Sequence, residues 1–294
     1  MTSWTSFPIP VLPTERRTGL NGKTKISFTA RIASAPYVLW AIVFIVTPML
    51  FVAYYAFTDR GGSFTLDNFV ESFDYTGVFL QSIWYGLIST FVCFLLAYPL
   101  AYIIAKKSGR SQKVLLLLVM LPMWMNLLIR TYAWMTILQD TGVINSVLRF
   151  LGLGTVHMIN TGGSVVLGMV YNFFPYMILP IYSVMTKLER SYVEAAQDLG
   201  ANAGQVLKKV IFPLTLPGVV SGCTMVFVPS VSTFYISQKL GNTKLIGDII
   251  ETQFKAANNY HVGASLSLVL MVMILICLMV MNRFADDDGG GLIV

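Results

Sequence analysis

The sequence predicts an all-α integral membrane protein with six transmembrane helices. Of its 294 residues, 55% are hydrophobic and only 12% are charged, whereas an average soluble domain has about twice that charged fraction. Too few charged side chains are present to cover the surface of a soluble core of this size. The second observation is a series of long uncharged segments, each able to cross a hydrocarbon core about 30 Å thick.

Five segments are uncharged over the length of about 20 residues that a transmembrane helix needs. A sixth segment, 114–138, contains one charge, Arg130, which can reach the interface from a position near the helix end. These six helices define a membrane domain, 35–282, between a polar, basic tail, 1–34, and an acidic tail, 283–294. The five uncharged segments are 35–57, 78–105, 158–186, 210–238 and 262–282.

Lysine and arginine residues collect in alternate connecting segments. Fourteen lie in the first tail, in two loops, 106–113 and 187–209, and at Arg283, whereas the three other loops together hold five. Basic residues next to transmembrane helices are retained on the cytoplasmic side. Both termini and the loop after the fourth helix are therefore predicted to be cytoplasmic, and the three sparsely charged loops to be external.

The residues usual in metal and catalytic sites are scattered. The three cysteines, Cys93, Cys223 and Cys277, lie far apart in apolar segments, which indicates buried thiols rather than a disulfide or a zinc site. His157 and His261 are isolated in different loops, and no glycine-rich phosphate loop ending in Gly-Lys-Ser or Gly-Lys-Thr occurs. The sequence thus predicts a non-enzymatic chain without a metal or cofactor of its own, and without a basic segment typical of nucleic-acid binding.

The loop between the fourth and fifth helices, 187–213, is longer than a tight turn requires and predicts a helix, a turn and a second helix. Ser191 and Glu194 have the spacing of a capping box at the start of the first helix. Gly200 is predicted to end that helix, and a second short helix, 202–209, is predicted to lead back to the membrane. Two prolines mark where the chain returns to it, Pro213 and Pro217.

This loop contains a motif of Glu194, Ala195 and Ala196, then Gly200 four positions later, and Val210 and Phe212 before Pro213. The motif resembles the EAA loop of binding-protein-dependent ABC importer permeases, in which Ile and Leu replace the two apolar residues. The resemblance implies the type I permease architecture in a bacterial inner or plasma membrane. It also implies a coupling helix whose Glu194 faces a basic residue in a separate ATPase subunit, which binds ATP and Mg²⁺. The alternative is an interfacial helix on which Glu194 and Asp198 are merely solvated.

Three further segments are similar to the polyamine branch of this family, the permease subunits of spermidine and putrescine importers. They are 66–73, 121–138 with the following 142–145, and 234–254. The resemblance implies three partners: a second homologous permease subunit, a homodimeric ATP-binding subunit and an extracytoplasmic polyamine-binding protein. Branches that carry iron or aminoethylphosphonate share part of the pattern and leave the cargo open. A gradient-driven secondary transporter is another alternative, but it would place carboxylates in mid-membrane, and this sequence has none there.

A polyamine cargo requires carboxylates and aromatic faces, because both attract ammonium groups. Aromatic residues cluster in the fourth helix, where Pro175 and Pro180 are predicted to disturb the backbone beside a cavity. The same aromatic side chains could instead pack against lipid or protein, and external loops are acidic in any case, because basic residues stay inside. The candidate path residues are Tyr171, Asn172, Phe174, Tyr176, Phe234, Tyr235, Asp248 and Glu251.

Arg130 is the only formal charge within a predicted transmembrane helix. It lies 16 residues after Val114, which is about 24 Å along a straight helix and close to the external interface. A cation there repels a polyamine, so Arg130 is expected to have a structural or gating role. We expect its guanidinium to pair with a backbone carbonyl or a carboxylate.

Overall fold

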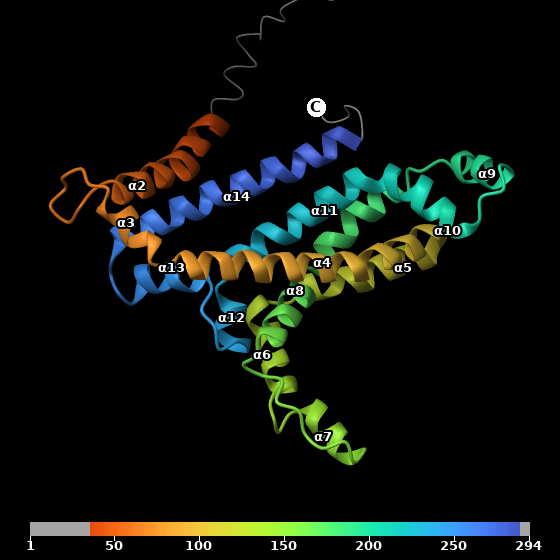
Figure 1. The fold of residues 1–294 in the computed structure, drawn as a ribbon, viewed down its shortest axis with the longest axis horizontal. Helices are drawn as coiled ribbons and strands as arrows, with labels where there is room; N and C mark the ends of the chain where they lie inside the picture. The colour runs from red at the N-terminus through yellow and green to blue at the C-terminus, as the bar shows by residue number, and fades with distance from the viewer. Residues whose placement is uncertain (1–35, 289–294) are drawn as a thin grey trace, which may run out of the picture. The chain divides into compact units, whose positions relative to one another are not determined.

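The computed structural model describes residues 36–288, which are mostly helical (Figure 1). In that part of the chain, one isolated β-bridge joins Thr58 and Phe64. The predicted all-α class is confirmed. The helices are η1 (Ile42–Val46), α2 (Thr47–Ala56), α3 (Asp67–Phe73), α4 (Thr76–Lys106), α5 (Gly109–Met120), η2 (Leu121–Trp124), α6 (Leu127–Leu138), α7 (Val143–Phe150), α8 (Gly162–Met185), α9 (Arg190–Asp198), α10 (Ala203–Val206), η3 (Leu207–Ile211), α11 (Phe212–Ser232), α12 (Tyr235–Leu240), α13 (Ile246–Lys255) and α14 (Tyr260–Asp288).

The chain divides into two units, residues 1–49 and residues 50–294. The first unit contains the start of an apolar helix, in which the π-helical turn η1 precedes α2. This helix spans Pro36–Ala56 and agrees with the first predicted transmembrane segment. The predicted tail, 1–34, lies outside the described residues.

Within residues 36–288, five helices are long and apolar enough to cross a membrane. Besides the first, they are Thr76–Lys106, Gly162–Met185, Ala203–Ser232 and Tyr260–Met281. The prediction of a straight third transmembrane helix is wrong, because this segment is a pair of helical stretches bent by 93°, Gly109–Trp124 and Leu127–Phe150. This segment, the third in chain order, is therefore interrupted by a bend.

The break in the third span has a local cause. Pro122, which lacks a backbone N–H, lies in the 3-10 turn η2 after α5. Met125 then takes an extended conformation with ψ of 146°. The Asn126 side chain caps α6 by accepting a hydrogen bond of 2.8 Å from the Leu128 N–H. An apolar composition identifies a span, but it does not reveal that a proline and an N-cap residue divide it.

The core of residues 50–288 lies where α4, α8 and α11 pack together. Small residues let these helices approach closely, as is common between transmembrane helices. A Cβ atom at Gly222 of α11 would come within 3.0 Å of the Met177 carbonyl oxygen of α8. Buried residues from all three helices form one apolar cluster: Cys93, Ala97, Ala101, Met177, Ile178, Ile181, Met185, Val219 and Val226.

The prediction of a disturbed backbone in the fourth helix is wrong. α8 continues through Pro175 and Pro180 as one helix. Pro175 is buried, and α8 packs against both α4 and α11, so neighbouring helices hold it in place despite the missing N–H groups.

Two predicted helix ends also differ from the structure. The fifth helix ends at Ser232 rather than at 238, because Thr233 is extended, with ψ of 143°. Gly247 of α13 packs against the carbonyl oxygens of Ser232 and Thr233, where a Cβ atom would not fit. The last helix, α14, continues to Asp288 and does not stop where the acidic tail was predicted to begin, at 283.

Candidate functional site

The predicted coupling segment forms α9, which connects α8 to the long helix that begins at Ala203. α9 and α10 lie at one end of the helices of the second unit, whereas α12 and α13 lie toward the other end of α11 (Figure 1). Glu194, Ala195 and Asp198 are exposed and Ala196 is half-buried. The segment therefore presents small and acidic side chains on an accessible surface.

Gly200 ends α9 in the predicted way. Its φ of +82° lies in the left-handed region, which glycine adopts without strain. The Gly200 N–H donates to the Gln197 carbonyl at 2.8 Å, and the Ala201 N–H donates to the Ala196 carbonyl at 3.0 Å. These two bonds form a Schellman motif, which satisfies carbonyl groups at the end of the helix.

The predicted capping box at Ser191 is wrong. α9 begins at Arg190, two residues before the start that a Ser191 cap would give, and the Ser191 hydroxyl donates to the Glu189 carboxylate at 3.2 Å. The capping box lies instead at the start of α10, where Asn202 and Gln205 exchange side-chain to backbone hydrogen bonds of 2.9 Å. This pattern accepts Asn and Gln as well as Ser and Glu, so the sequence contains two candidate capping boxes. Sequence alone does not show which of the two forms.

The second short helix predicted at 202–209 is not a separate element. Residues Ala203–Ser232 form one continuous helix, and Pro213 and Pro217 lie inside it. The π-helical turn η3 immediately precedes Pro213. Such a turn relieves the clash between a proline ring and the carbonyl four residues earlier. The turn after α9 therefore leads directly into the helix that continues as α11.

A cavity of about 720 Å³ lies beside α9. Its lining includes Glu194 of α9, Val206 of α10, and Tyr102 and Lys106 at the end of α4. The Lys106 ammonium lies 4.2 Å from the centre of the Tyr102 ring, within the range of a cation–π contact. α9 is thus separated from the helix ends by a space rather than packed tightly against them.

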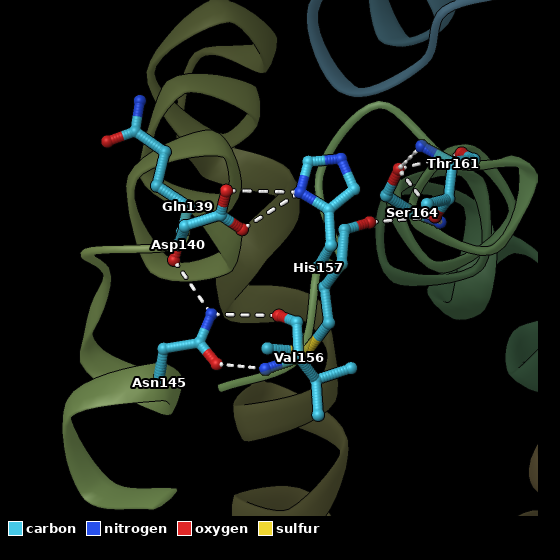
Figure 2. Close-up of polar contacts among 8 residues, drawn as sticks. Gln139, Asp140, Asn145, Val156, His157, Thr161 and Ser164 are labelled. Carbon is cyan, nitrogen blue, oxygen red and sulfur yellow. Dashed lines mark hydrogen bonds and ion pairs between the residues drawn. The ribbon is translucent and has the colours of Figure 1, made fainter. Parts of the chain in front are cut away.

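The loops that flank α7 are fixed by polar contacts, which Figure 2 shows. Asn145 is fully buried; its amide nitrogen donates to the Val156 carbonyl at 2.9 Å and to the Gln139 carbonyl at 3.2 Å, and its oxygen accepts from the Val156 N–H at 2.8 Å. His157 Nδ1 lies 2.9 Å from the Asp140 carboxylate. The position of His157 in the sequence suggested that it was isolated, but it pairs with Asp140.

His261, also predicted to be isolated, has a partner as well. Its Nδ1 lies 3.1 Å from the Tyr55 carbonyl oxygen, and its ring meets the Tyr55 ring edge to face. These two residues are 206 positions apart in the chain. The contact links α14 to the end of α2. The long separation in the sequence gave no indication of this contact.

The candidate path residues of α8 have different surroundings. The Tyr171 ring meets the Trp134 ring of α6 edge to face, and Tyr176 is exposed. Asn172 is buried; its amide donates to the Gly168 carbonyl at 2.8 Å, while its oxygen has no partner among the described residues. Phe174 packs against the core cluster of α4, α8 and α11. Tyr176 is thus the most accessible of the four.

Phe234 and Glu251, which are distant in the sequence, line one cavity of about 580 Å³ between α13 and α14. The Glu251 carboxylate accepts hydrogen bonds from Lys255 at 2.8 Å and from Gln238 at 2.7 Å. The hydrogen bond from Lys255 holds the pKa of the Glu251 carboxyl below its usual value. Glu251 is therefore an anion already matched with one lysine.

Asp248, a candidate path residue, is buried in the described chain, where only 1% of it is exposed. One carboxylate oxygen accepts from the Ser237 hydroxyl at 2.6 Å and from the Leu245 N–H at 2.8 Å. Its other oxygen is buried without a partner among the described residues. Burial raises the pKa of Asp248, and these hydrogen bonds oppose the rise. Asp248 thus joins the start of α13 to α12.

Arg130 is not where a straight helix would place it, because the span breaks four residues earlier. Its Nε and Nη1 atoms are buried and have no hydrogen-bond partner within residues 36–288. No carbonyl or carboxylate of the described residues pairs with these two atoms, so the expected pairing of Arg130 stays a prediction. A guanidinium withdrawn from water without partners is costly.

The structure also brings together three residues that sequence analysis overlooked as a group. The Tyr132 ring of α6 meets the Tyr235 ring of α12 at 81°, with 6.2 Å between the ring centres. The Lys239 ammonium lies 5.7 Å from the centre of the first ring and 5.8 Å from that of the second. The spacing of four between Tyr235 and Lys239 indicates one helix face, but nothing in the sequence indicates Tyr132.

Residues 97–286 match the family described as binding-protein-dependent transport system inner membrane component. The chain belongs to this family. The matched region begins within α4 and includes the bent third span, α9, α12 and α13. Membership makes the chain a multi-pass inner membrane component of a transport system, and it agrees with the EAA loop resemblance.

Relatives in this family cover most of the chain. The spermidine/putrescine transport system permease protein PotB of Haemophilus influenzae is 36% identical over 258 residues, covering 83% of this chain and 90% of the relative. PotB of Escherichia coli (strain K12) is 35% identical over 256 residues, covering 83% and 93%. The fold resembles a chain from a bacterial alginate ABC transporter in complex with an alginate pentasaccharide-bound periplasmic protein, with a TM-score of 0.68, 16% identity, and coverage of 88% and 94%.

Proposed function

We propose that this chain is the transmembrane permease subunit of an ABC importer for polyamines, forming half of a translocation pathway for spermidine and putrescine. One observation carries the proposal: 36% identity to a spermidine/putrescine permease over 83% of this chain and 90% of that protein. Similarity over nearly the whole length of both chains includes the external segments as well as the loop common to the family. Cargo is thus inferred from more than the coupling loop.

The importer contains three kinds of partner. A second homologous permease subunit completes the pathway, a homodimeric ATP-binding subunit binds ATP and Mg²⁺, and an extracytoplasmic protein delivers the polyamine. The family description supports the last of these, since it names a binding-protein-dependent system. ATP hydrolysis belongs to the separate subunit, because this sequence has no Gly-Lys-Ser or Gly-Lys-Thr phosphate loop.

α9 is the coupling helix in this proposal. Glu194 and Asp198 are exposed on it, and a carboxylate there suits a basic socket on the ATPase, because charge-assisted hydrogen bonds are among the stronger ones. Ala195 and Ala196 permit close approach of the partner surface. Gly200 sets the angle between α9 and the long helix, so that a push on α9 reaches α11.

The chain crosses the membrane with both termini in the cytoplasm. This orientation rests on the distribution of Lys and Arg, fourteen of which lie in alternate segments. It puts α9 on the cytoplasmic side, next to the ATPase, and α7, α12 and α13 on the external side, next to the binding protein. Asparagine-linked or cysteine-reactive reporters introduced on α7 and α9 would report opposite accessibility if the orientation is right.

The translocation path in this proposal runs along α8 and the segment from Phe234 onward. Its members are Tyr171, Asn172, Phe174, Tyr176, Phe234, Tyr235 and Glu251. Asp248 stabilises the start of α13 through its hydrogen bonds with Ser237 and Leu245. Arg130 has a gating role, in which its two free buried donors pair with a group on the second permease in one state of the cycle. A buried cation without a partner favours such an exchange.

Uptake by the reconstituted importer tests this function. The two permeases and the ATPase are placed in liposomes with ATP inside, and the binding protein is added outside with radiolabelled spermidine or putrescine. We expect uptake of at least one amine that stops when ATP is replaced by a non-hydrolysable analogue. ATP-driven uptake of neither amine would contradict the polyamine assignment, and proteoliposomes without this chain are the matched control.

A further inference from the structure

An arrangement of α6 and α12 suggests how the pathway holds its cargo. The Tyr132 and Tyr235 rings stand nearly perpendicular, and the Lys239 ammonium lies within 6 Å of both ring centres. Within residues 36–288, no carboxylate lies within ion-pair distance of Lys239. The described partners of this cation are therefore the Tyr132 hydroxyl and the two aromatic rings rather than an anion, which is the chemistry of a tyrosine-lined ammonium site.

We propose that Tyr132 and Tyr235 form a binding site for a substrate ammonium group, and that Lys239 fills this site in the structure as a tethered substitute. The inference rests on the proposed function, since it specifies how a polyamine would be held. The ligand is a primary or secondary ammonium, and it enters by displacing an ammonium of equal charge. The net charge of the site is thus the same before and after exchange.

The geometry permits this exchange. Tyr132 is 48% exposed, so the ring pair is open to a ligand from outside the chain. Lys239 lies on the last turn of α12, and its four-carbon stem can swing the ammonium away while its backbone stays fixed. α12 is itself held firmly, because the Ser237 hydroxyl donates to the buried Asp248 carboxylate at 2.6 Å. A rigid ring pair with a mobile resident cation is suited to binding followed by release.

Equilibrium binding measurements distinguish a specific effect of Lys239 on spermidine affinity from the general effect of removing a positive charge. The complex of both permeases and the ATPase is prepared in detergent without the binding protein, and the Kd for radiolabelled spermidine is measured. Removing the competing cation in Lys239→Gln is expected to lower Kd by about two- to fivefold, the range that corresponds to one cation–π contact. Lys239→Arg, which keeps a cation, is expected to leave Kd unchanged. Lys244→Gln removes the same charge from the exposed loop before α13 and is the matched control.

The rings are tested in the same assay. Tyr132→Leu is expected to raise Kd by about two- to fivefold, whereas Tyr132→Phe keeps the π face and is expected to change Kd by less than that. Equal Kd values for the Leu and Phe variants, or equal effects of Lys239→Gln and Lys244→Gln, would overturn the site. If Tyr132→Leu does not assemble, the two lysine variants still decide.

Uptake by the wild-type complex distinguishes failure of this inference from failure of the function. Uptake of spermidine together with unchanged Kd values in all variants rejects the aromatic site alone. Absence of any polyamine uptake rejects the proposed function, and the site with it.

Discussion

The α9 loop and the α12–α13 segment both connect transmembrane helices, but they are stabilised in different ways. The α9 loop is fixed by bonds between near neighbours, such as those of Gly200 and the Asn202–Gln205 pair. The α12–α13 segment is fixed by distant partners: the Ile246 N–H donates to the Ser82 hydroxyl, 164 positions away, at 2.8 Å. The α9 loop can thus be built from local sequence, whereas the position of the α12–α13 segment depends on the whole fold.

The largest expected effect tests the exposed acid of the α9 loop. Glu194→Lys reverses the charge that we assign to the ATPase socket, and it should lower ATP-driven uptake by at least about tenfold, the equivalent of about 1.4 kcal/mol. The amount of the chain in the membrane should not change, because Glu194 is exposed. Uptake and copurification of the ATPase are measured together, with Lys187→Glu as a charge-reversal control outside the motif. Undiminished uptake would reject the docking assignment.

The second prediction tests the buried acid of the α12–α13 segment. Asp248→Ala leaves the Ser237 hydroxyl and the Leu245 N–H without their buried acceptor, which costs about 1–3 kcal/mol. The Tm of the purified chain should fall by about 4 °C or more. Glu251→Gln, which removes one member of a more accessible pair with Lys255, should shift Tm much less. Equal shifts for both variants would show that Asp248 does not join the two helices.

The third prediction tests the turn after α9. Gly200 has φ of +82°, and a Cβ atom there would meet nothing within 4 Å, so backbone strain alone should decide the effect. Gly200→Val is expected to cost about 1–3 kcal/mol and to weaken ATPase copurification, because a β-branched residue rarely adopts this conformation. Gly200→Asn should be much milder, since Asn tolerates it. Equal effects of Val and Asn would contradict the strain argument.

The smallest expected effect concerns the capping box of α10. Asn202→Ala removes the acceptor for the Gln205 N–H and should destabilise the start of this helix by about 1 kcal/mol. Hydrogen exchange at residues 203–206 should increase, while exchange in α11 stays slow. Ser191→Ala is the control, because Ser191 caps nothing and bonds only to Glu189. If Ser191→Ala had the larger effect, the capping box would lie at α9 after all.

Local patterns predicted most of the helices and one part of the candidate site. Apolar length identified the spans, and the glycine at position 200 identified the end of α9, because both properties depend on residues close in the sequence. The third span was misjudged because Pro122 and Asn126 act on the backbone and leave hydropathy unchanged. The burial of Asp248 could not be predicted, because it depends on α12, whose Ser237 donates to the Asp248 carboxylate.

By itself, the sequence determined that the chain is a membrane protein and that basic loops alternate along the chain. It also determined that one of these basic loops contains an acidic helix that ends in a glycine turn. Only the tertiary structure decided that Tyr132 meets Tyr235 and Lys239, and that Arg130 keeps two buried donors without partners in the described chain. The physical reason is distance along the chain. Hydropathy and turn geometry are properties of neighbouring residues, whereas contacts between helices depend on how the packed core of α4, α8 and α11 orients every segment attached to it.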